Sequence, residues 1–462
     1  MLEKREIEQK AQEFGIHTAN VERDYIFGWL LAGIYSISEL KDELALKGGN
    51  CFRKGYFQNT RFSRDLDFSI QTVISEKSLL QELNNVCNFV QRSTQVTFEK
   101  GLNQVKEERS IDSERKVYEA RLYFKGFYGQ EKIIIKIPLD VTQFDRVHLP
   151  VQNQHLIHPY SDADKCPVEI RCVKLEELVA NKLKCLLQRR HSLDLYDYVY
   201  SIFVNKDIEI NKSEVVKTFL KKTIFESSPG AAISLLLELP FEIFRSVWSR
   251  YLICPERSVI KFDFAIEKFK QSVKELFGSF PRLRFDLKYF PPKFRNPIME
   301  AGHTLTLVEV VYDGYSRIVE PYSLSYKIRK DGVAREYLYV YDRTGGRSGP
   351  GIKCFVADKI RSIKNTKERF EPRYPVELSR ASEYGDKRYF SSRSSALAYR
   401  VYGSQAPSVW NYSHGITYVV ECLYCGKRFR RKKHDTRLRN HKDSYGNPCF
   451  GRVGEVVDEV YS

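Results

Sequence analysis

The sequence predicts an α+β protein of several domains, and three observations carry this prediction. The chain has 462 residues, 42% of them hydrophobic and 29% charged, which is typical of about two to four globular domains. Apolar residues recur mostly at helical spacing up to about residue 280 and alternate with a period of two after residue 300. Three cysteines and a histidine then gather between residues 422 and 449. We expect a mixed first part, a small β-rich domain and a metal-binding module.

The charge balance narrows the choice of partners. Basic residues outnumber acidic ones by 75 to 59, a net charge of +16, which favours nucleic acid. No stretch approaches the roughly 18 apolar residues of a membrane helix, and the start MLEKREIEQK lacks the apolar centre of a secretion signal. The first seven cysteines lack the spacing of a disulfide framework. We therefore expect a cytoplasmic protein with reduced thiols and no membrane partner.

The first domain is expected to span residues 1–205. Helical periodicity up to residue 46 ends at the glycine pair of KGGN, and FSRDLDFSI (62–70) then alternates like a strand. A helix over residues 77–93, strands between 95 and 144, and an amphipathic helix over 174–190 follow. A helical extension is expected over residues 206–280.

Three aspartates predict a metal site in this domain. Asp65 and Asp67 are two residues apart, so on a strand they project side by side, and Asp140 ends the apolar strand IIIKIPLD. Adjacent carboxylates repel each other, and Mg²⁺ between them resolves the repulsion. One or two such ions would clamp a triphosphate and activate an attacking hydroxyl. Gly48 and Gly49, just upstream, allow backbone amides to approach phosphate oxygens closely.

This arrangement resembles nucleotidyltransferases of the polymerase-β type. The run KGGN…RFSRDLDFSI, the preceding helix VERDYIFGWLL and the later block LEELVANKLKCLLQRRHSLDLYDYVY are similar to the AbiEii/AbiGii abortive-infection toxin family. The resemblance covers residues 1–205 and extends toward 280. It implies a set of catalytic residues: Asp65, Asp67, Asp140, Lys182, Asp194 and Asp197. It implies a set of nucleotide-binding residues: Lys47, Gly48, Gly49, Asn50, Arg61, Ser63 and Lys182.

The block around Lys182 has a physical interpretation of its own. A lysine within the helix can place a cation on the phosphates and neutralise charge that builds up during phosphoryl transfer. Asp194 and Asp197 are three apart and share a helix face, so they could hold Lys182, orient Arg189 or Arg190, or accept a proton from the incoming hydroxyl. The family commonly has Ser or Thr where this chain has Asn50, and Glu where it has Asn181.

A second domain is expected over residues 300–380, after a linker over 281–299 that is rich in proline, aromatic and basic residues. RIVEPYSL, EYLYVYDR and FVADKI, in this order, resemble the WYL domain, a small Sm-like β-barrel. The resemblance implies a groove for a nucleotide or nucleic acid, bordered by Arg317, Tyr337 and Lys359. The alternative is a barrel that only spaces the two ends of the chain.

The last module is expected over residues 396–462 and carries a metal-binding pattern. Cys422, Cys425, His441 and Cys449 form a Cys-x2-Cys-x15-His-x7-Cys set, which predicts a closed, structural Zn²⁺ site resembling treble-clef or C2HC fingers. His434 is a competing ligand. Residues 422–452 hold ten Lys or Arg against two Asp, about half of the net charge, interleaved with Tyr424 and Phe429. Basic charge with aromatic rings is typical of a surface that binds a nucleic-acid backbone and stacks on its bases.

These parts lead to a functional hypothesis with two alternatives. The first is a Mg²⁺-dependent nucleotidyltransferase toxin that transfers a nucleoside monophosphate from an NTP to RNA, with tRNA as the leading acceptor and an antitoxin as partner. The second is a ligand-sensing, nucleic-acid-binding regulator in which the first domain only senses a nucleotide. The third keeps the enzyme but makes a protein the acceptor.

Overall fold

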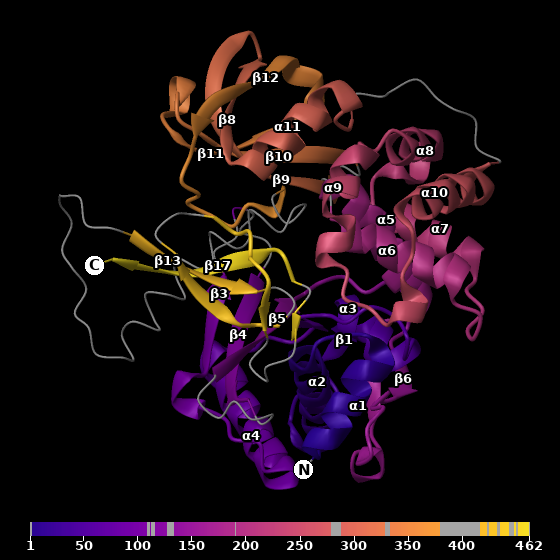
Figure 1. Ribbon diagram of the computed structural model, residues 1–462. Helices are drawn as coiled ribbons and strands as arrows, with labels where there is room; N and C mark the ends of the chain where they lie inside the picture. Colours follow the sequence, from indigo (N-terminus) through magenta and orange to yellow (C-terminus); the bar gives the residue numbers. More distant parts are fainter. Residues whose placement is uncertain are drawn as a thin grey trace.

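The computed structural model describes most of the chain, and Figure 1 shows its arrangement. The described residues are 2–108, 111, 116–126, 134–189, 191–278, 288–328, 333–378, 416–422, 425–431, 435–442, 448–449 and 451–461. Arg190, Tyr424 and His434, three candidates from the sequence, lie outside them. No helix in this part of the chain is both long and apolar enough to cross a membrane.

A seven-stranded mixed sheet forms the centre of the first domain, in the order β3-β4-β5-β2-β1-β7-β6. β2 runs parallel to β5, and β1 runs parallel to β7, whereas the other neighbours are antiparallel. The strands are β1 Ala45–Lys47, β2 Leu66–Ile70, β3 Gln104–Glu108, β4 Lys116–Lys125, β5 Ile134–Gln143, β6 Gln152–His155 and β7 Glu169–Cys172. The strand expected from residue 62 begins only at Leu66, and the Phe62 amide instead donates to the Ile253 carbonyl oxygen at 2.7 Å, outside the sheet.

Helices surround this sheet and continue into the helical extension. α2 is buried on nearly every side, in keeping with its mostly apolar sequence, whereas α4 is amphipathic and starts after Ser75, whose side chain accepts a hydrogen bond from the Ser78 amide. One hydrophobic core runs from Leu2 to Tyr289, so the parts predicted as 1–205 and 206–280 share it. The helices are α1 Lys4–Phe14, α2 Thr18–Ile37, α3 Gly48–Cys51, α4 Glu76–Thr94, α5 Leu175–Gln188, α6 Ser192–Val199, α7 Lys212–Lys222, α8 Pro229–Leu237, α9 Phe241–Tyr251 and α10 Phe262–Phe277.

The middle domain is a five-stranded antiparallel sheet in the order β11-β10-β9-β8-β12. Its strands are β8 Thr306–Tyr312, β9 Tyr315–Ile328, β10 Ala334–Asp342, β11 Gly351–Phe355 and β12 Ile360–Arg369. The closed barrel expected from the WYL resemblance is not observed, because β12 takes the free edge of β8, and no pairing with β11 closes the sheet within the described residues. The sheet is therefore open, with β11 and β12 at its edges.

Helix α11 (Pro292–Thr304) replaces much of the predicted linker. Pro292 stands in its first turn, where a missing amide hydrogen costs nothing. Phe294, Ile298 and Met299 lie on one face of the helix and are buried in the core of the middle domain. The helical spacing of apolar residues within this segment indicated a helix, but its high content of proline and basic residues led to the prediction of a linker.

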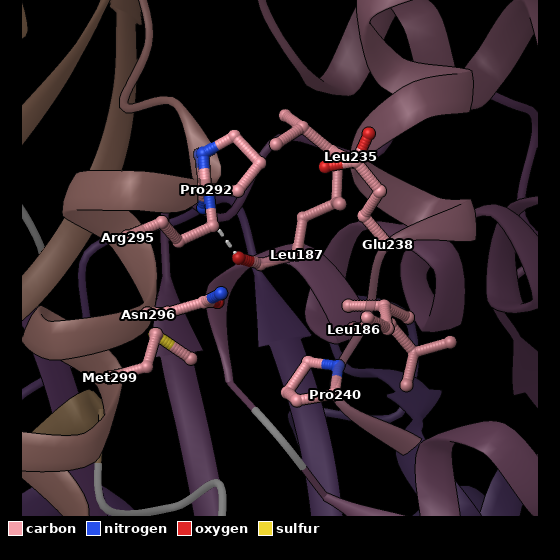
Figure 2. A pocket seen from close by; sticks show the side chains of 10 residues that line it. Leu186, Leu187, Leu235, Glu238, Pro240, Pro292, Arg295, Asn296 and Met299 are labelled. Atoms are coloured by element: carbon pink, nitrogen blue, oxygen red, sulfur yellow. Dashed lines mark hydrogen bonds between the residues drawn. The ribbon is translucent and has the colours of Figure 1, made fainter.

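A buried joint connects the middle domain to the end of α5 (Figure 2). The Arg295 guanidinium donates from Nη1 to the Leu187 carbonyl oxygen at 2.6 Å and pairs through Nη2 with Glu336 at 2.5 Å. Gln188 Nε2 donates to the Leu324 carbonyl oxygen of β9 at 2.9 Å. α5 also carries Lys182, so the middle domain is attached directly to the helix that bears a candidate catalytic residue.

The C-terminal strands form a small separate body with its own core. A three-stranded sheet has the order β14-β13-β17, and β15 pairs with β16. The strands are β13 Ile416–Cys422, β14 Arg428–Arg431, β15 His441–Lys442, β16 Pro448–Cys449 and β17 Gly454–Tyr461.

Candidate active site and metal centre

The sheet register brings two of the three predicted aspartates together. Asp67 on β2 lies directly opposite Asp140 on the parallel strand β5, and opposed residues point to the same face of a sheet. Asp65 comes just before β2, where its carboxylate accepts a hydrogen bond from Ser63 Oγ at 2.9 Å. Burial, followed by the neighbouring Asp65 carboxylate, raises the pKa of Asp67 to about 6, although Lys47 opposes this. The site therefore holds negative charge that is not fully neutralised.

This donor set fits a hard divalent cation. Mg²⁺ prefers oxygen ligands and is usually bound through one or two carboxylates together with phosphate oxygens. Among the described residues, the Cys/His group of the C-terminal module is the only set of three or more possible metal ligands found close together, and its ligand atoms all lie within 4.8 Å of one another. The aspartate oxygens are not gathered as closely, as expected for like charges that repel each other.

The glycine turn before β2 approaches the aspartates so closely that side chains are excluded. Gly48 has φ +70°, and a Cβ atom there would lie 1.9 Å from Asp67 Oδ2. A Cβ atom on Gly49 would lie 2.6 Å from Ser63 Oγ. The Asn50 side chain is fully buried and donates from Nδ2 to the Asp65 carbonyl oxygen, so its amide stabilises the turn.

We predict that Gly48→Ala lowers nucleotidyl transfer by about a hundredfold or more. The new methyl group would displace the Asp67 carboxylate and strain the backbone, and small displacements of reacting groups cost about this much. Initial rates of transfer measure the effect. Gly101→Ala is the matched control because nothing lies within 4 Å of its Cβ position. Equal activity of both variants would contradict the close approach of this turn to the reacting groups.

Three cations and two carboxylates form a cluster beside the aspartates. Lys182 Nζ lies 2.9 Å from Asp194 Oδ1 and 2.8 Å from Asp197 Oδ2. Arg61 pairs with Asp197 through two hydrogen bonds at 2.6 and 2.8 Å, and Arg189 pairs with Asp194 at 2.9 and 3.1 Å. The cluster carries a net charge of +1, and Lys182 and Arg189 both act on Asp67 electrostatically. It can therefore present positive potential to an anion held at the aspartates.

The two carboxylates of this cluster are held in their charged form. Burial alone would raise the pKa of Asp194, but Arg189 and Lys182 outweigh it and hold this pKa far below its usual value. Burial likewise opposes the lowering of the Asp197 pKa, which Arg61 and Lys182 cause. A carboxylate with so low a pKa is a poor base. Of the three roles open to these aspartates, the geometry favours holding Lys182 and orienting Arg61 and Arg189.

Sequence reasoning did not identify two further carboxylates near these residues, those of Glu119 and Asp145. Glu119 on β4 lies opposite Asp140 and accepts hydrogen bonds from Arg121 at 2.6 and 2.9 Å. Lys47 Nζ lies 2.6 Å from Asp145 Oδ2, just beyond β5. The alternation of KVYEARLYFK contained the signal for Glu119, but the pairing of β4 with β5 was needed to place it beside Asp140.

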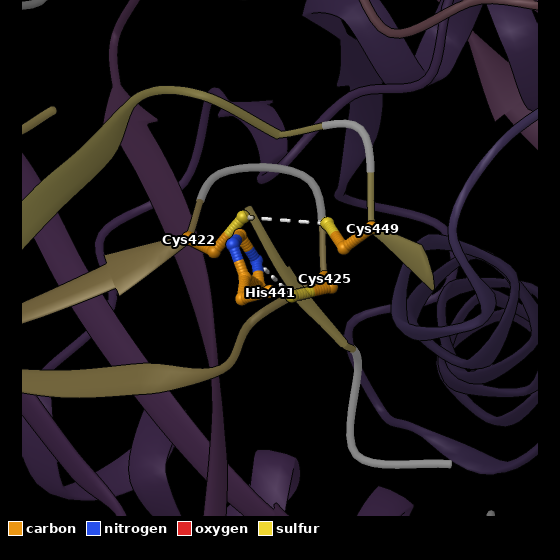
Figure 3. Close-up of side chains that lie close together, drawn as sticks. All are labelled: Cys422, Cys425, His441 and Cys449. Carbon is orange, nitrogen blue, oxygen red and sulfur yellow. Dashed lines mark hydrogen bonds between the residues drawn. The ribbon is translucent and has the colours of Figure 1, made fainter. Parts of the chain in front are cut away.

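The C-terminal module brings its four predicted ligands together (Figure 3). Cys422 Sγ and Cys449 Sγ are 3.8 Å apart, which is about the edge of a tetrahedron with Zn–S bonds of about 2.3 Å. Cys425 Sγ lies 3.2 Å from His441 Nε2. His441 Nδ1 lies 2.9 Å from the Arg439 carbonyl oxygen, which can only accept, so Nε2 keeps a lone pair for a metal. These residues fit a closed, structural Zn²⁺ site.

We predict that metal removal unfolds this module and leaves the first domain folded. The core of the module consists of Val420, Leu438 and the three cysteines, which is too little apolar surface to be stable alone. Hydrogen exchange with and without a chelator should show loss of protection confined to residues 416–461. Cys425→Ser should reproduce this loss, whereas Cys354→Ser, at an exposed cysteine of the middle domain, should not. Hydrogen-exchange protection of residues 416–461 that survives both the chelator and Cys425→Ser would contradict a structural metal.

The three residues predicted to border a groove in the middle domain have separate partners. Arg317 Nη1 donates to Asp342 at 2.7 Å, and Lys353 contacts the same carboxylate at 2.9 Å. Lys359 is exposed and lies 3.5 Å from Asp313, and Tyr337 is half-buried against the core of the domain. The ligand groove stays a prediction.

The central sheet, the paired aspartates and the glycine turn are the features of a nucleotidyltransferase, and comparison with known proteins gives the same class. The chain belongs to the AbiEii nucleotidyltransferase toxin family: the family model "Nucleotidyl transferase AbiEii toxin, Type IV TA system" matches residues 29–267, more than half of the chain. This match includes every predicted catalytic residue and ends before the middle domain. No curated protein sequence matches the chain.

Two solved structures are similar to part of the chain. One is JHP933 from Helicobacter pylori, with a TM-score of 0.34 and 16% identity, covering 57% of this chain and 94% of that protein. The other is MenT4, nucleotidyltransferase toxin Rv2826c from Mycobacterium tuberculosis H37Rv, with a TM-score of 0.36 and 15% identity. The match covers 60% of this chain and 99% of that protein.

Proposed function

We propose that this protein is a Mg²⁺-dependent toxin that transfers a nucleoside monophosphate from an NTP to an RNA acceptor, with tRNA as the first candidate. We propose further that it acts with an antitoxin in phage defence or in a toxin–antitoxin system. One observation carries the proposal: Asp67 lies opposite Asp140 and directly beneath the Gly48 turn. Carboxylates for metal and a backbone turn free of side chains are the two parts that a triphosphate site needs.

The reaction would be a single displacement at the α-phosphorus of the NTP. The acceptor hydroxyl oxygen bonds to this phosphorus, the bond to the oxygen bridging to the β-phosphorus breaks, pyrophosphate leaves, and the hydroxyl proton passes to water. Asp65, Asp67 and Asp140 would hold Mg²⁺, which when bound offsets the charge of the phosphates. The amides of the Gly48–Gly49 turn would contact the phosphates, and the Lys182 cluster would favour the negative charge that moves onto pyrophosphate.

The charge distribution supports RNA as the acceptor. The chain carries a net charge of +16, and residues 422–452 alone hold ten Lys or Arg. In the described part of the module, Arg428 is exposed on β14 and Phe429 is half-buried beside it. Such a surface suits a phosphate backbone better than a protein acceptor.

Label transfer tests the proposal. Purified full-length protein is incubated with Mg²⁺, total cellular RNA and each of the four α-labelled NTPs in turn, with Asp67→Asn as the inactive control. Label on a tRNA-sized band that the control lacks supports the proposal and identifies the nucleotide. Label on a protein band would replace RNA by a protein acceptor. Tight RNA binding without any label would instead favour the sensing regulator.

A further inference from the structure

The C-terminal end of α5 is completed by groups of the middle domain. Arg189, the residue after the helix, is extended rather than left-handed, and the last turn contains no basic side chain. Within the described residues, this helix end therefore lacks the glycine turn or local cation that commonly satisfies the last carbonyl groups of a helix. The Arg295 guanidinium of α11 takes this place, because it donates to the Leu187 carbonyl oxygen at 2.6 Å. Gln188 Nε2 in turn donates to the Leu324 carbonyl oxygen of β9 at 2.9 Å.

Arg295 is itself fixed within the middle domain. Its Nη2 atom pairs with Glu336 of β10, which is fully buried and also accepts a hydrogen bond from the Phe290 amide at 2.8 Å. The cavity between α5 and α11 at this joint measures about 10 Å³, which leaves room for about one water molecule (Figure 2). The position of the α5 end therefore depends on the middle domain.

A chain of ion pairs leads from this helix end to the glycine turn. Arg189 contacts Asp194 at 2.9 and 3.1 Å, and Asp194 also holds Lys182 at 2.9 Å. The second carboxylate of this cluster holds Arg61, whose Nη2 atom lies 2.8 Å from the Cβ position of Gly49. A displaced α5 end would therefore shift the cations that border the proposed triphosphate site.

The middle domain lies outside the segment that defines the family. The family match ends at residue 267, and α11 begins at Pro292. A domain that only spaced the two ends of the chain would need no buried ion pair against α5. The buried joint therefore favours a role for this domain in the chemistry of the first domain.

We infer that Arg295 and Gln188 are positioning residues of the transfer reaction, which fix the C-terminal end of α5 and thereby the Lys182 cluster at the triphosphate site. The inference rests on the proposed function. It makes the middle domain a part of the catalytic unit. Both residues act through Arg189, so their loss should lower the rate of transfer and leave the affinity for RNA unchanged.

The test compares three variants with the wild-type full-length protein: Gln188→Met, the double variant Arg295→Met with Glu336→Leu, and the combination of all three substitutions. Methionine fills the space of Gln188 without a donor, and the double variant removes the guanidinium without leaving a buried carboxylate unpaired. Lys174→Met is the matched control, because it removes an ion pair with Glu214 at the other end of α5. Label transfer gives kcat and KM for RNA, and urea unfolding gives the stability.

The combined variant is expected to lower kcat about tenfold, since misplacing catalytic groups by about 1 Å can cost about a hundredfold. KM for RNA and the free energy of unfolding should stay close to those of the wild type. In an Arg189→Gln background the same substitutions should lower kcat no further, because they act through Arg189. A purely structural role would instead give a loss that follows the unfolded fraction and adds to that of Arg189→Gln.

Other results would overturn the inference in distinguishable ways. Wild-type kcat in the combined variant would show that α5 keeps its position without these contacts. A loss that adds fully to that of Arg189→Gln would place the effect outside the chain of ion pairs. Gln188→Met, at a half-buried position, gives the same comparison should the Arg295 double variant fail to fold. Failure of the wild type to transfer label to any acceptor would overturn the proposed function itself, and the inference with it.

Discussion

Asp67→Asn is expected to lower nucleotidyl transfer by at least about a thousandfold and, in the same protein, to raise the stability of the metal-free fold at pH 7. The loss of activity follows from the position of Asp67 opposite Asp140, because the asparagine amide would lack the negative charge that a metal ion needs. The gain in stability follows from the raised pKa. The two effects together separate a catalytic carboxylate from a structural one, whose removal would lower both quantities.

The sign of the stability effect follows from the pKa. Burial and Asp65 raise the pKa of Asp67 to about 6, above the ordinary value of 3.8 that applies in the unfolded chain. The folded protein therefore holds this proton more tightly, and its stability falls as pH rises from about 4 to about 6. Above pH 6 the penalty is complete, and asparagine removes it. Below pH 4 the aspartate is neutral in both states, and the difference should vanish.

Transfer assays and thermal unfolding at pH 4 and pH 7 measure the two effects. Asp42→Asn, at an exposed position outside the site, is the control and should leave both quantities unchanged. Adding Mg²⁺ should reverse the order of stability, because the wild type gains binding energy that the variant cannot. A variant that loses stability at pH 7 without metal would contradict the placement of Asp67 in an unneutralised site.

Arg295→Met is expected to lower the free energy of unfolding by about 3–5 kcal/mol, the largest effect that we predict on stability. Glu336 is fully buried and pairs with this guanidinium at 2.5 Å, and its other partner is the Phe290 amide at 2.8 Å. Removing the cation would leave a buried carboxylate without its counter-charge. The Leu187 carbonyl oxygen would also lose a donor, which loosens the attachment of α5 to the middle domain.

Urea unfolding followed by circular dichroism measures this loss. The double variant Arg295→Met with Glu336→Leu should recover most of it, because replacing both members of a buried pair leaves no stranded charge. Arg335→Met is the control, since Arg335 pairs with Asp358 and both side chains are partly exposed to water, unlike Glu336. If the single variant is as stable as the wild type, the Arg295–Glu336 pair does not hold this joint together.

The candidate site shows which groupings of residues could be predicted from the sequence. Asp65, Asp67 and the glycine turn are near one another in the chain, so strand alternation and turn chemistry were enough to group them. The four Cys/His ligands were found in the same way, because the ligand spacing of a small module is local. The confirmed part of the prediction is the enzyme class and its family.

The remaining features depend on contacts between distant segments. Glu119 lies beside Asp140 only because β4 pairs with β5, and Arg61 reaches Asp197 across 136 residues of sequence. The linker prediction for residues 292–299 was made from composition, yet the middle sheet buries these residues as part of α11. No local pattern could show that Lys182 would be paired with two aspartates while the Arg23 Nε atom would be buried without a hydrogen-bond partner.

The sequence by itself therefore determined the chemistry that this protein carries: paired aspartates, a glycine turn, a helix with Lys182 and a Cys/His metal set. Only the tertiary structure decided which charges neutralise one another and which remain open to a ligand. The physical reason is that the electrostatic free energy of a charged group depends on its distance to other charges and on its separation from water. Both are set by how the sheet and helices pack.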